Sequence, residues 1–289
     1  MNSLALSLVI AGALLHALWN VSAKKAAGGL PFVWLYGLVS LVACLPVGLA
    51  AWRAGAALPG LAGWAAIAGS ALVHAVYSLV LQKGYQESDF TVVYPLARGT
   101  GPLFSVFGAM LVLGELPSPL GWLGIIAILA GILMISGNAR LLAAPLPRLR
   151  AGLFWGVLTG LCIAAYTVID GWAVKALAIQ PVIYYVLSLV LRTALLTPQA
   201  LRAPQRLRAQ WRANARHVVV VGVLSPAAYT LVLFAMTMAP LSYVAPVREL
   251  SMLIGILFGA RLLREAFSLL RVIGVAAMVA GVLMISFAG

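Results

Sequence analysis

Apolar residues run in blocks of about 20 along almost the whole chain, and short polar gaps separate the blocks. A membrane-spanning helix needs about 20 mainly apolar residues, because the hydrocarbon core of a bilayer is about 30 Å thick. This length predicts ten spans, at about 4–22, 31–51, 62–82, 92–113, 119–137, 152–172, 180–200, 217–236, 241–261 and 268–287. The predicted fold class is therefore an all-α integral membrane protein with ten transmembrane helices.

Two stretches of the chain, 98–136 and 248–286, repeat each other at a constant offset of about 150 residues. Each begins with Arg, carries a Glu at the same position (Glu115 and Glu265) and ends in AGILMIS or AGVLMIS. Such a register indicates an internal duplication, which dictates the architecture. We expect both Glu residues to have a structural role in a turn between helices. Glycines at small-residue spacing predict close helix packing in both copies: Gly121, Gly124, Gly131, Gly274 and Gly281.

The duplication divides the chain into a first five-helix repeat at 1–138, a linker at 139–151 and a second five-helix repeat at 152–289. Because each half holds an odd number of spans, the second half enters the membrane from the opposite side to the first. The sequence thus predicts two inverted repeats, a plan found in secondary transporters that bind their substrate near the bilayer midplane between the repeats. Another polar stretch, 201–216, is predicted as an amphipathic basic segment at the membrane surface.

The composition of the chain indicates that its solvent is lipid. The 289 residues are 64% hydrophobic and 9% charged, whereas soluble domains have roughly 45–50% apolar and about 25% charged residues. The net charge of +13 would indicate nucleic-acid binding in a soluble protein. Here the basic residues lie between apolar spans, so we predict no nucleic-acid partner. Cys44 and Cys162 lie deep in spans, and no metal, cofactor or nucleophile–base motif stands out, so we predict no enzyme.

The basic residues between the spans indicate an orientation. Loops after odd-numbered spans hold fourteen Lys and Arg residues, whereas loops after even-numbered spans hold only Arg53 and Lys175. Cytoplasmic loops carry the excess of positive charge in membrane proteins. Both termini are therefore predicted to lie outside the cytoplasm. The N-terminal apolar run has no basic region before it and no small-residue cleavage pattern, so we expect a retained helix and not a cleaved signal.

The first span carries His16, Trp19 and Asn20, and polar or ionisable residues within spans are candidates for function because they are costly in lipid. His16 and Asn20 are four residues apart and share a helix face. At the repeat offset they correspond to Tyr166 and Asp170 in the sixth span. This correspondence predicts two facing helices that line one cavity. The alternative is that these side chains form interhelical hydrogen bonds that only hold helices together.

The third span carries polar residues at four-residue spacing, His74, Ser78 and Gln82, with Tyr77 beside them. Its counterpart in the eighth span is clearest at YTLVL, which begins with Tyr229 and matches YSLVL from Tyr77. A protonatable His in such a stripe would allow transport to be coupled to the proton gradient. The alternative is that His74 stays neutral and only forms hydrogen bonds.

The fourth and ninth spans carry a Pro shortly before an Arg, in VVYPLAR with Tyr94 and Arg98 and in YVAPVRE with Arg248 and Glu249. Proline frees a backbone carbonyl, which membranes tolerate only where the backbone lines a cavity or packs in protein. Arg98 and Arg248 are predicted to bind a carboxylate or phosphonate through their planar guanidinium groups. The alternative is that they extend to the membrane interface. Glu249 is expected to pair with an Arg, and Arg192 is a further buried-cation candidate.

These features resemble the EamA family of the drug/metabolite transporter superfamily over nearly the whole chain, as two repeats. The resemblance rests on Pro95–Arg98, on a Gly–Glu turn before a Gly-rich span that ends in GILMISG, and on HALWN at His16–Asn20. In the second half Arg264 replaces the glycine of the turn. The resemblance implies a multi-pass permease of the bacterial inner membrane that moves amino acids or other small metabolites by alternating access, often as an exporter. Both termini would then be periplasmic.

The leading prediction is a secondary active transporter that exports a small polar metabolite such as an amino acid or organic anion. Its partners would be the lipid bilayer and a small-molecule substrate, without a cofactor, in a monomer or homodimer; coupling to the proton gradient stays open. The alternatives are a multidrug or cation exporter, a lipid-linked sugar flippase and, more remotely, a non-transporting membrane scaffold. The predicted substrate-binding residues combine charges with aromatic walls: His16, Trp19, Asn20, His74, Tyr77, Tyr94, Arg98, Tyr166, Asp170, Tyr229, Arg248 and Glu249.

Overall fold

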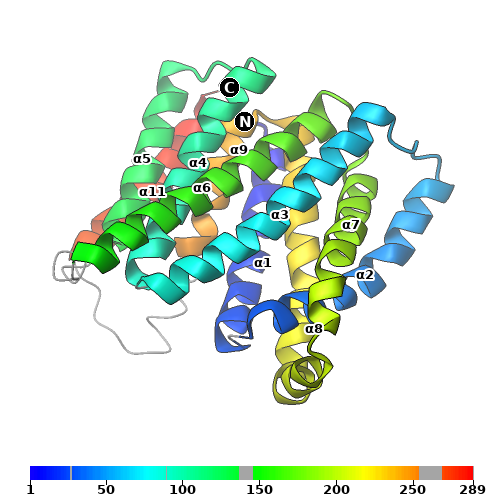
Figure 1. Ribbon diagram of the computed structural model, residues 1–289. Coiled ribbons are helices and arrows are strands. Elements are labelled where there is room, and N and C mark those ends of the chain that lie inside the picture. Colours follow the sequence, from blue (N-terminus) through cyan, green and yellow to red (C-terminus); the bar gives the residue numbers. More distant parts are fainter. Residues whose placement is uncertain (27, 89, 137–145, 254–268, 289) are drawn as a thin grey trace.

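The computed structural model describes residues 1–26, 28–88, 90–136, 146–253 and 269–288, and every element in these residues is a helix (Figure 1). The prediction of an all-helical protein is confirmed. Glu265 and the second half of the ninth predicted span lie outside the described residues. The helices are α1 (Ser3–Ala26), α2 (Gly29–Arg53), α3 (Leu61–Glu87), α4 (Phe90–Leu113), α5 (Pro119–Ser136), α6 (Leu146–Lys175), α7 (Pro181–Leu201), α8 (Pro204–Met238), α9 (Leu241–Arg248) and α11 (Leu269–Phe287).

Most of these helices have the length and composition of membrane spans. Within the described residues, seven helices are long and apolar enough to cross a membrane: α1, α2, α3, α4, α6, α7 and α8. Two shorter apolar helices cover Pro119–Ile135 and Val272–Phe287. Large apolar side chains such as Leu61 and Leu111 are exposed on the outer surface. Such exposure is expected for helices whose surroundings are lipid, because apolar side chains need no shielding there.

The described part of the ninth predicted span, residues 241–253, is helical except at Glu249. α9 ends at Arg248, and Glu249 adopts a turn before helical residues resume at Leu250. Pro246 has no N–H to donate to the Ser242 carbonyl oxygen, so α9 lacks one hydrogen bond of a regular helix. The N–H of Glu249 donates to the Pro246 carbonyl oxygen at 3.0 Å, which tightens the chain into a turn at this point. The interruption places the charged side chains of Arg248 and Glu249 side by side in the interior.

The two halves of the chain are interleaved. α1 packs along α8, and α6 packs along α3. These two contacts are equivalent, since α6 and α8 occupy in the second half the places of α1 and α3 in the first. α4 also packs along α6, and α5 along α11 (Figure 1). The main helix contacts therefore join one half to the other, and residues of both halves meet in the interior.

A close contact joins α5 and α11, the last helices of the two halves. A Cβ atom on Gly131 would lie 2.6 Å from the carbonyl oxygen of Gly274, and one on Gly281 would lie 2.6 Å from that of Gly124. Only glycine permits two helix backbones to approach so closely. Because Gly124 contacts Gly281 and Gly131 contacts Gly274, the two helices run antiparallel. The predicted close packing of these glycines is confirmed.

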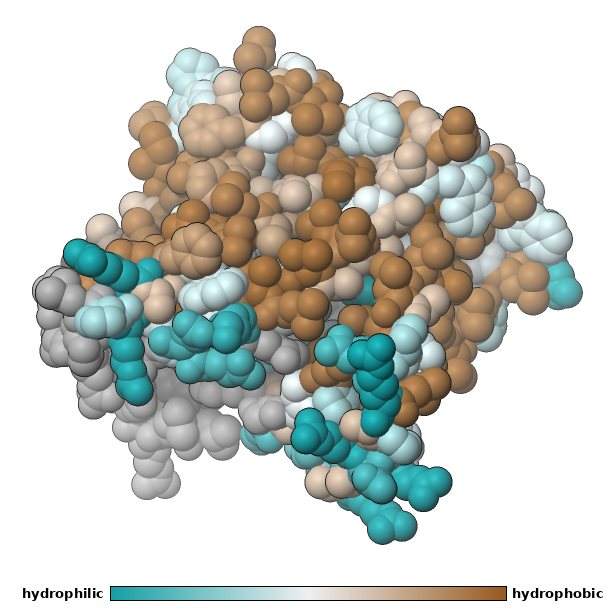
Figure 2. All heavy atoms as spheres, in the orientation of Figure 1, coloured by the Kyte–Doolittle hydropathy of each residue, from teal (hydrophilic) through white to brown (hydrophobic). Residues whose placement is uncertain are grey.

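Both ends of the chain lie on one face of the molecule, which we call the terminal face (Figure 1). The N-terminal ammonium donates to the carbonyl oxygen of Ser286 at 3.4 Å, and Oγ of Ser118 donates to that of Ala288 at 3.1 Å. On the opposite face, hydrophilic side chains gather over the starts of α6 and α8, next to a broad apolar belt (Figure 2). The termini thus share one face, as predicted, and the membrane side of that face stays a prediction.

Candidate functional site

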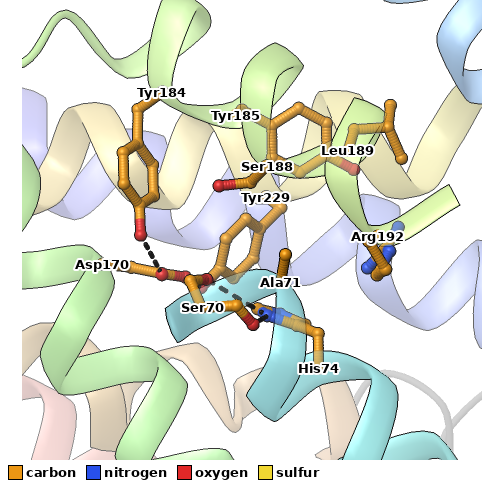
Figure 3. Close-up of a pocket in the computed structure, with 10 residues that line it drawn as sticks. All are labelled: Ser70, Ala71, His74, Asp170, Tyr184, Tyr185, Ser188, Leu189, Arg192 and Tyr229. Carbon is orange, nitrogen blue, oxygen red and sulfur yellow. Dashed lines mark hydrogen bonds between the residues drawn. The ribbon is translucent and has the colours of Figure 1, made fainter. Parts of the chain in front are cut away.

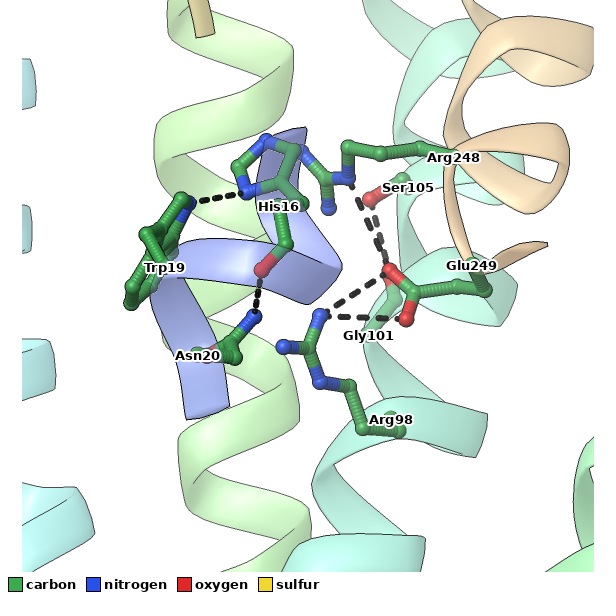
Figure 4. Close-up of polar contacts among 8 residues, drawn as sticks. All are labelled: His16, Trp19, Asn20, Arg98, Gly101, Ser105, Arg248 and Glu249. Atoms are coloured by element: carbon green, nitrogen blue, oxygen red, sulfur yellow. Dashed lines mark hydrogen bonds and ion pairs between the residues drawn. The ribbon is translucent and has the colours of Figure 1, made fainter. Parts of the chain in front are cut away.

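Arg98, Arg248 and Glu249 form a charged group in the interior, which we call the arginine cluster (Figure 4). Nη1 of Arg98, from α4, donates to Oε2 of Glu249 at 3.1 Å and to Oε1 at 3.5 Å. Nε of Arg248 lies 3.6 Å from the same Oε1, and the side chains of Arg248 and Glu249 are only 5% and 1% exposed. The expectation that Glu249 pairs with an Arg is confirmed.

The arginine cluster holds two positive charges against one negative charge. Within the described part of the chain, no other carboxylate lies within ion-pairing distance of either Arg. The guanidinium of Arg98 also lies over the ring of Tyr94, 5.3 Å from its centroid, a favourable cation–π position. Its side chain is 18% exposed, more than those of its two partners. A buried charge is costly unless it is paired. One anionic group of a ligand would therefore neutralise the remaining positive charge of the arginine cluster.

The polar residues of α1 lie beside the arginine cluster. Nε1 of Trp19 donates to Nδ1 of His16 at 3.0 Å, and Nδ2 of Asn20 donates to the His16 carbonyl oxygen at 2.7 Å. Because Nδ1 accepts a bond, a neutral His16 carries its hydrogen on Nε2. Nε2 is buried and has no hydrogen-bond partner among the described residues. The His16 ring lies next to the Arg248 guanidinium (Figure 4), so a buried donor without a protein acceptor stands beside the two Arg residues.

Asp170 lies in a second polar group, where α3, α6, α7 and α8 meet (Figure 3). The Tyr184 hydroxyl donates to Oδ1 at 2.6 Å, and the Tyr229 hydroxyl donates to Oδ2. Asp170 is 0% exposed, and among the described residues no Lys or Arg nitrogen lies within ion-pairing distance of it. A buried carboxylate in this situation depends on its hydrogen bonds. Asp170 can therefore take up a proton without breaking an ion pair.

His74 on α3 stands beside this group. Its Nδ1 lies 2.9 Å from the carbonyl oxygen of Ser70, and its own carbonyl accepts a bond from Oγ of Ser78 at 3.0 Å. Its ring stacks on Tyr166 with centroids 3.9 Å apart, and Tyr166 meets the Tyr77 ring edge-on. The bond to the backbone makes Nδ1 a donor, so the neutral ring offers Nε2 as an acceptor. Two members of the predicted stripe, His74 and Ser78, thus form hydrogen bonds within α3.

A cavity of about 20 Å³ lies against Asp170, large enough for one water molecule. Oγ of Ser188 is buried at its edge and has no partner within the described residues, which favours a polar occupant. Among all the residues that the structure describes, no three His, Cys, Asp or Glu side chains are placed to hold a metal ion. Neither Ser70 nor Ser188 was predicted from the sequence, because hydroxyls in apolar spans give no distinct signal. The lining consists of Ser70, Ala71, His74, Asp170, Tyr184, Tyr185, Ser188, Leu189, Arg192 and Tyr229.

The structure divides the predicted site residues between two neighbouring groups. His16 and Asn20 lie with the arginine cluster (Figure 4), whereas Asp170 lies against the small cavity (Figure 3). The two groups use different partners: His16 lies next to Arg248 (Figure 4), whereas Asp170 accepts bonds from Tyr184 and Tyr229.

An apolar groove of about 390 Å³ lies between α2, α7 and α8. Tyr185 lines both this groove and the small polar cavity, so the two spaces approach each other at its ring. An apolar groove on lipid-facing helices suits a hydrocarbon chain or ring. Its lining consists of Ala43, Cys44, Val47, Val182, Tyr185, Val186, Val223, Pro226, Ala227, Thr230, Leu231 and Phe234.

At the terminal face, Glu115 joins Lys175, at the end of α6, to the start of α9. We call these contacts the terminal clamp. The N–H groups of Leu241 and Ser242 each donate to the carboxylate at 2.8 Å, as does Nζ of Lys175. Nζ of Lys175 also donates to the Ala239 carbonyl oxygen at 3.2 Å. Burial raises the pKa of Glu115, but these donors lower it more, so its pKa lies below the ordinary glutamate value. The expected structural role of Glu115 is confirmed.

The helices and their buried charges define a class: a multi-pass membrane protein built from two related halves that meet around ionised side chains. The model of the EamA-like transporter family matches this chain twice, over residues 3–137 and 150–287. The chain therefore belongs to the EamA-like transporter family of the drug/metabolite transporter superfamily, whose members are transporters and not enzymes. The two matches follow the two repeats that the sequence predicts.

Comparison with individual proteins adds the fold. No curated protein matches the chain significantly. Among solved structures, the chain is similar to one described only as the crystal structure of a protein, with a TM-score of 0.78. The likeness covers 98% of this chain and 96% of that chain at 15% sequence identity. At this identity the comparison shows a common fold over nearly the full length of both chains and nothing about substrate.

Proposed function

We propose that the chain is a secondary active transporter that exports a small metabolite with a carboxylate group, such as an amino acid or organic anion, across the bacterial inner membrane by alternating access. The proposal includes ten membrane crossings and an inverted relation of the two halves. The antiparallel contact of α5 with α11 supports the inversion, because these helices are equivalent members of the repeats. The terminal clamp supports a state in which the terminal face is closed.

The proposal that the substrate has a carboxylate group rests on the excess positive charge of the arginine cluster. Arg98 and Arg248 come from equivalent positions of the two repeats and share one carboxylate, that of Glu249. A guanidinium binds a carboxylate through two parallel hydrogen bonds, which gives both affinity and orientation. The Nε2 donor of His16 offers one further bond. Secondary transporters of this plan bind substrate where the repeats meet. The arginine cluster combines residues of both repeats, so it lies at such a place.

In this proposal Asp170 carries the coupling proton. Its carboxylate is buried, receives bonds from two hydroxyls and borders a cavity that holds one water molecule. The Tyr229 hydroxyl binds Asp170 and also lies within the electrostatic range of Arg248. This contact would link the charge state of Asp170 with that of the arginine cluster. Collapse of an imposed pH gradient during substrate flux would support the assignment.

Flux into proteoliposomes tests the proposal. The purified protein is reconstituted and offered radiolabelled amino acids, organic acids, phosphonates and organic cations, with and without a proton gradient. We expect saturable flux of at least one carboxylated solute, reduced at least about tenfold in Arg98→Gln because a bidentate charged pair is lost. Arg150→Gln, an exposed cation at the start of α6, is the matched control and should keep wild-type flux. No carboxylate flux by folded protein, or equal flux in Arg98→Gln, would overturn the proposal.

The apolar groove favours a second candidate, the transport of an amphiphile that enters from the bilayer. Such a substrate, a lipophilic cation or a lipid-linked sugar, would place its apolar part between α2, α7 and α8 and its polar part past Tyr185. Ala227→Trp should fill the groove. If the substrate is an amphiphile, this variant loses flux; if the substrate is a small carboxylate at the arginine cluster, it keeps flux.

A further inference from the structure

The polar start of α8 is a basic segment, a name we use for residues 202–216. The segment holds five Arg residues and no Asp or Glu. Asn214, with φ −135° and ψ 20°, departs from helical geometry and kinks α8 at this point. In Figure 1 the start of α8 lies at the lower edge, opposite the termini, and turns away from the axis of the rest of the helix. The basic segment therefore lies at the end of the membrane-spanning part of α8 and does not continue it.

One face of the basic segment is fixed to the protein. Leu207 is buried, with 8% of its surface exposed. A Cβ atom on Gly28 would lie 2.1 Å from Nε2 of Gln210, so the glycine between α1 and α2 leaves the room that the Gln210 side chain occupies. Leu207 and Gln210 are three residues apart and share a helix face. The segment is thus docked on the turn between α1 and α2 and presents a defined outer surface.

The outer surface of the docked segment carries its Arg side chains. At about 100° per residue, Arg206, Arg208 and Arg212 each point at least about 100° away from Leu207 around the helix axis. Within the described residues, none of the five Arg side chains forms an ion pair. All five are exposed: Arg202, Arg206, Arg208, Arg212 and Arg216.

We propose that the basic segment binds the headgroups of anionic phospholipids at the membrane surface. Arg212 precedes Val218, the first fully buried apolar residue of the span, by six residues, and the kink at Asn214 between them keeps their separation along the span axis below the about 9 Å of a straight helix. An Arg side chain at that distance reaches the headgroup layer, whose phosphates match the guanidinium fork. Trp211, 43% exposed, is of the type that lies at membrane interfaces. A dissolved phosphate would match the Arg residues but gain nothing from Trp211.

The electrostatic contribution sets the expected size of the effect. Each basic residue near an anionic membrane surface raises binding about fivefold. Three such residues together would give about a hundredfold, and partial screening at physiological salt reduces this factor. We therefore expect the segment to prefer anionic over zwitterionic lipid by at least about tenfold. The proposal concerns the lipid surroundings and does not depend on the transported solute.

Lipid binding to the full-length protein tests the proposal. The protein is purified in neutral detergent and titrated with phosphatidylglycerol or with phosphatidylcholine of the same acyl chains, and bound lipids are counted by native mass spectrometry. The test variant replaces three Arg residues of the segment, R206Q/R208Q/R212Q. The control variant R53Q/R148Q/R150Q removes the same charge from three exposed Arg residues elsewhere. A third arm repeats the wild-type titration at about 0.5 M salt, where charges are screened beyond about 4 Å.

The expected result is a wild-type preference for phosphatidylglycerol of at least about tenfold, lost in the segment variant and at high salt and retained in the control variant. Three results would overturn the proposal: no preference in the wild-type protein, an unchanged preference in the segment variant, or an equal loss in both variants, which would mean that only net charge matters. A wild-type preference that persists at high salt would also overturn the proposal, and this arm needs no variant to fold.

Discussion

Replacement of Glu115 by Gln is expected to open the terminal clamp and to lower the free energy of unfolding by about 2 kcal/mol. The carboxylate uses one oxygen for the N–H of Leu241 and the other for that of Ser242. Gln has only one acceptor oxygen, so one of these N–H groups faces an amide donor. A hydrogen bond to a charged group contributes about 1.5–3 kcal/mol. The ion pair adds little, because Lys175 is 33% exposed and exposed pairs contribute about 0–1 kcal/mol.

Thermal unfolding followed with a thiol-reactive dye measures this effect. Cys162 is a buried free cysteine on α6, so it becomes reactive when the helices separate. The matched control is Glu87→Gln, which removes a carboxylate from an exposed pair with Lys83 whose side chains are 44% and 50% exposed. This control should change stability by less than about 0.5 kcal/mol. If Glu115→Gln is as stable as Glu87→Gln, the reasoning about the terminal clamp is refuted.

The pH dependence of the same difference isolates the carboxylate. Its donors hold the pKa of Glu115 below the ordinary value of 4.5 in the folded protein. Its stabilisation is therefore complete above the unfolded pKa and is lost as the pH falls through the folded pKa. The stability difference between wild type and Glu115→Gln should be constant from about pH 7 to about pH 5.5 and should shrink below about pH 4.5. A difference that stays constant or grows on acidification contradicts the assignment.

Three further predictions concern the interior. Asp170→Asn should fold and insert but lose the pH dependence of flux; a wild-type pH profile in flux assays would make Asp170 purely structural. Tyr184→Phe should lower the unfolding free energy by about 1.5–3 kcal/mol, since a buried charged hydrogen bond is lost, and an unchanged melting temperature would contradict that bond. Gly131→Ala should cost about 1–3 kcal/mol because a Cβ would lie 2.6 Å from the carbonyl of Gly274. Gly69→Ala, whose Cβ would meet only Cδ1 of Ile169 at an ordinary 3.8 Å, should not lower the melting temperature in the same assay.

The fold was largely predictable because lipid surroundings leave a strong signal in hydropathy. The apolar blocks predicted where the helices lie, and the repeat offset predicted which helices correspond. The close packing of Gly131 and its copy followed from this correspondence. The break after Arg248 was not predictable, since 241–261 is apolar on both sides of it. Pro246 alone does not decide between a kink and an end, because neighbouring helices determine whether the freed carbonyl finds a partner.

The candidate site was predictable only in part. The cost of a lone carboxylate in a membrane predicted that Glu249 pairs with an Arg, and the ion pair with Arg98 bears this out. That Asp170 accepts a bond from Tyr184 did not follow from the sequence, because Tyr184 resembles many hydroxyl residues that spans tolerate. The structure places His16 and Asp170 in two neighbouring groups, which the repeat alone did not predict. A repeat tells which residues correspond, whereas the residue that each one faces depends on how the helices pack.

The contact between α5 and α11 bears on how such a chain can arise. Gly124 meets Gly281 and Gly131 meets Gly274, and the repeat offset makes Gly274 the copy of Gly124 and Gly281 the copy of Gly131. The surface is therefore complementary to itself, as in a two-fold symmetric dimer. A half-length ancestor with this helix would already have bound a second copy of itself in the opposite orientation. Joining the two genes would preserve that contact and free each copy to acquire charges of its own, such as Glu249.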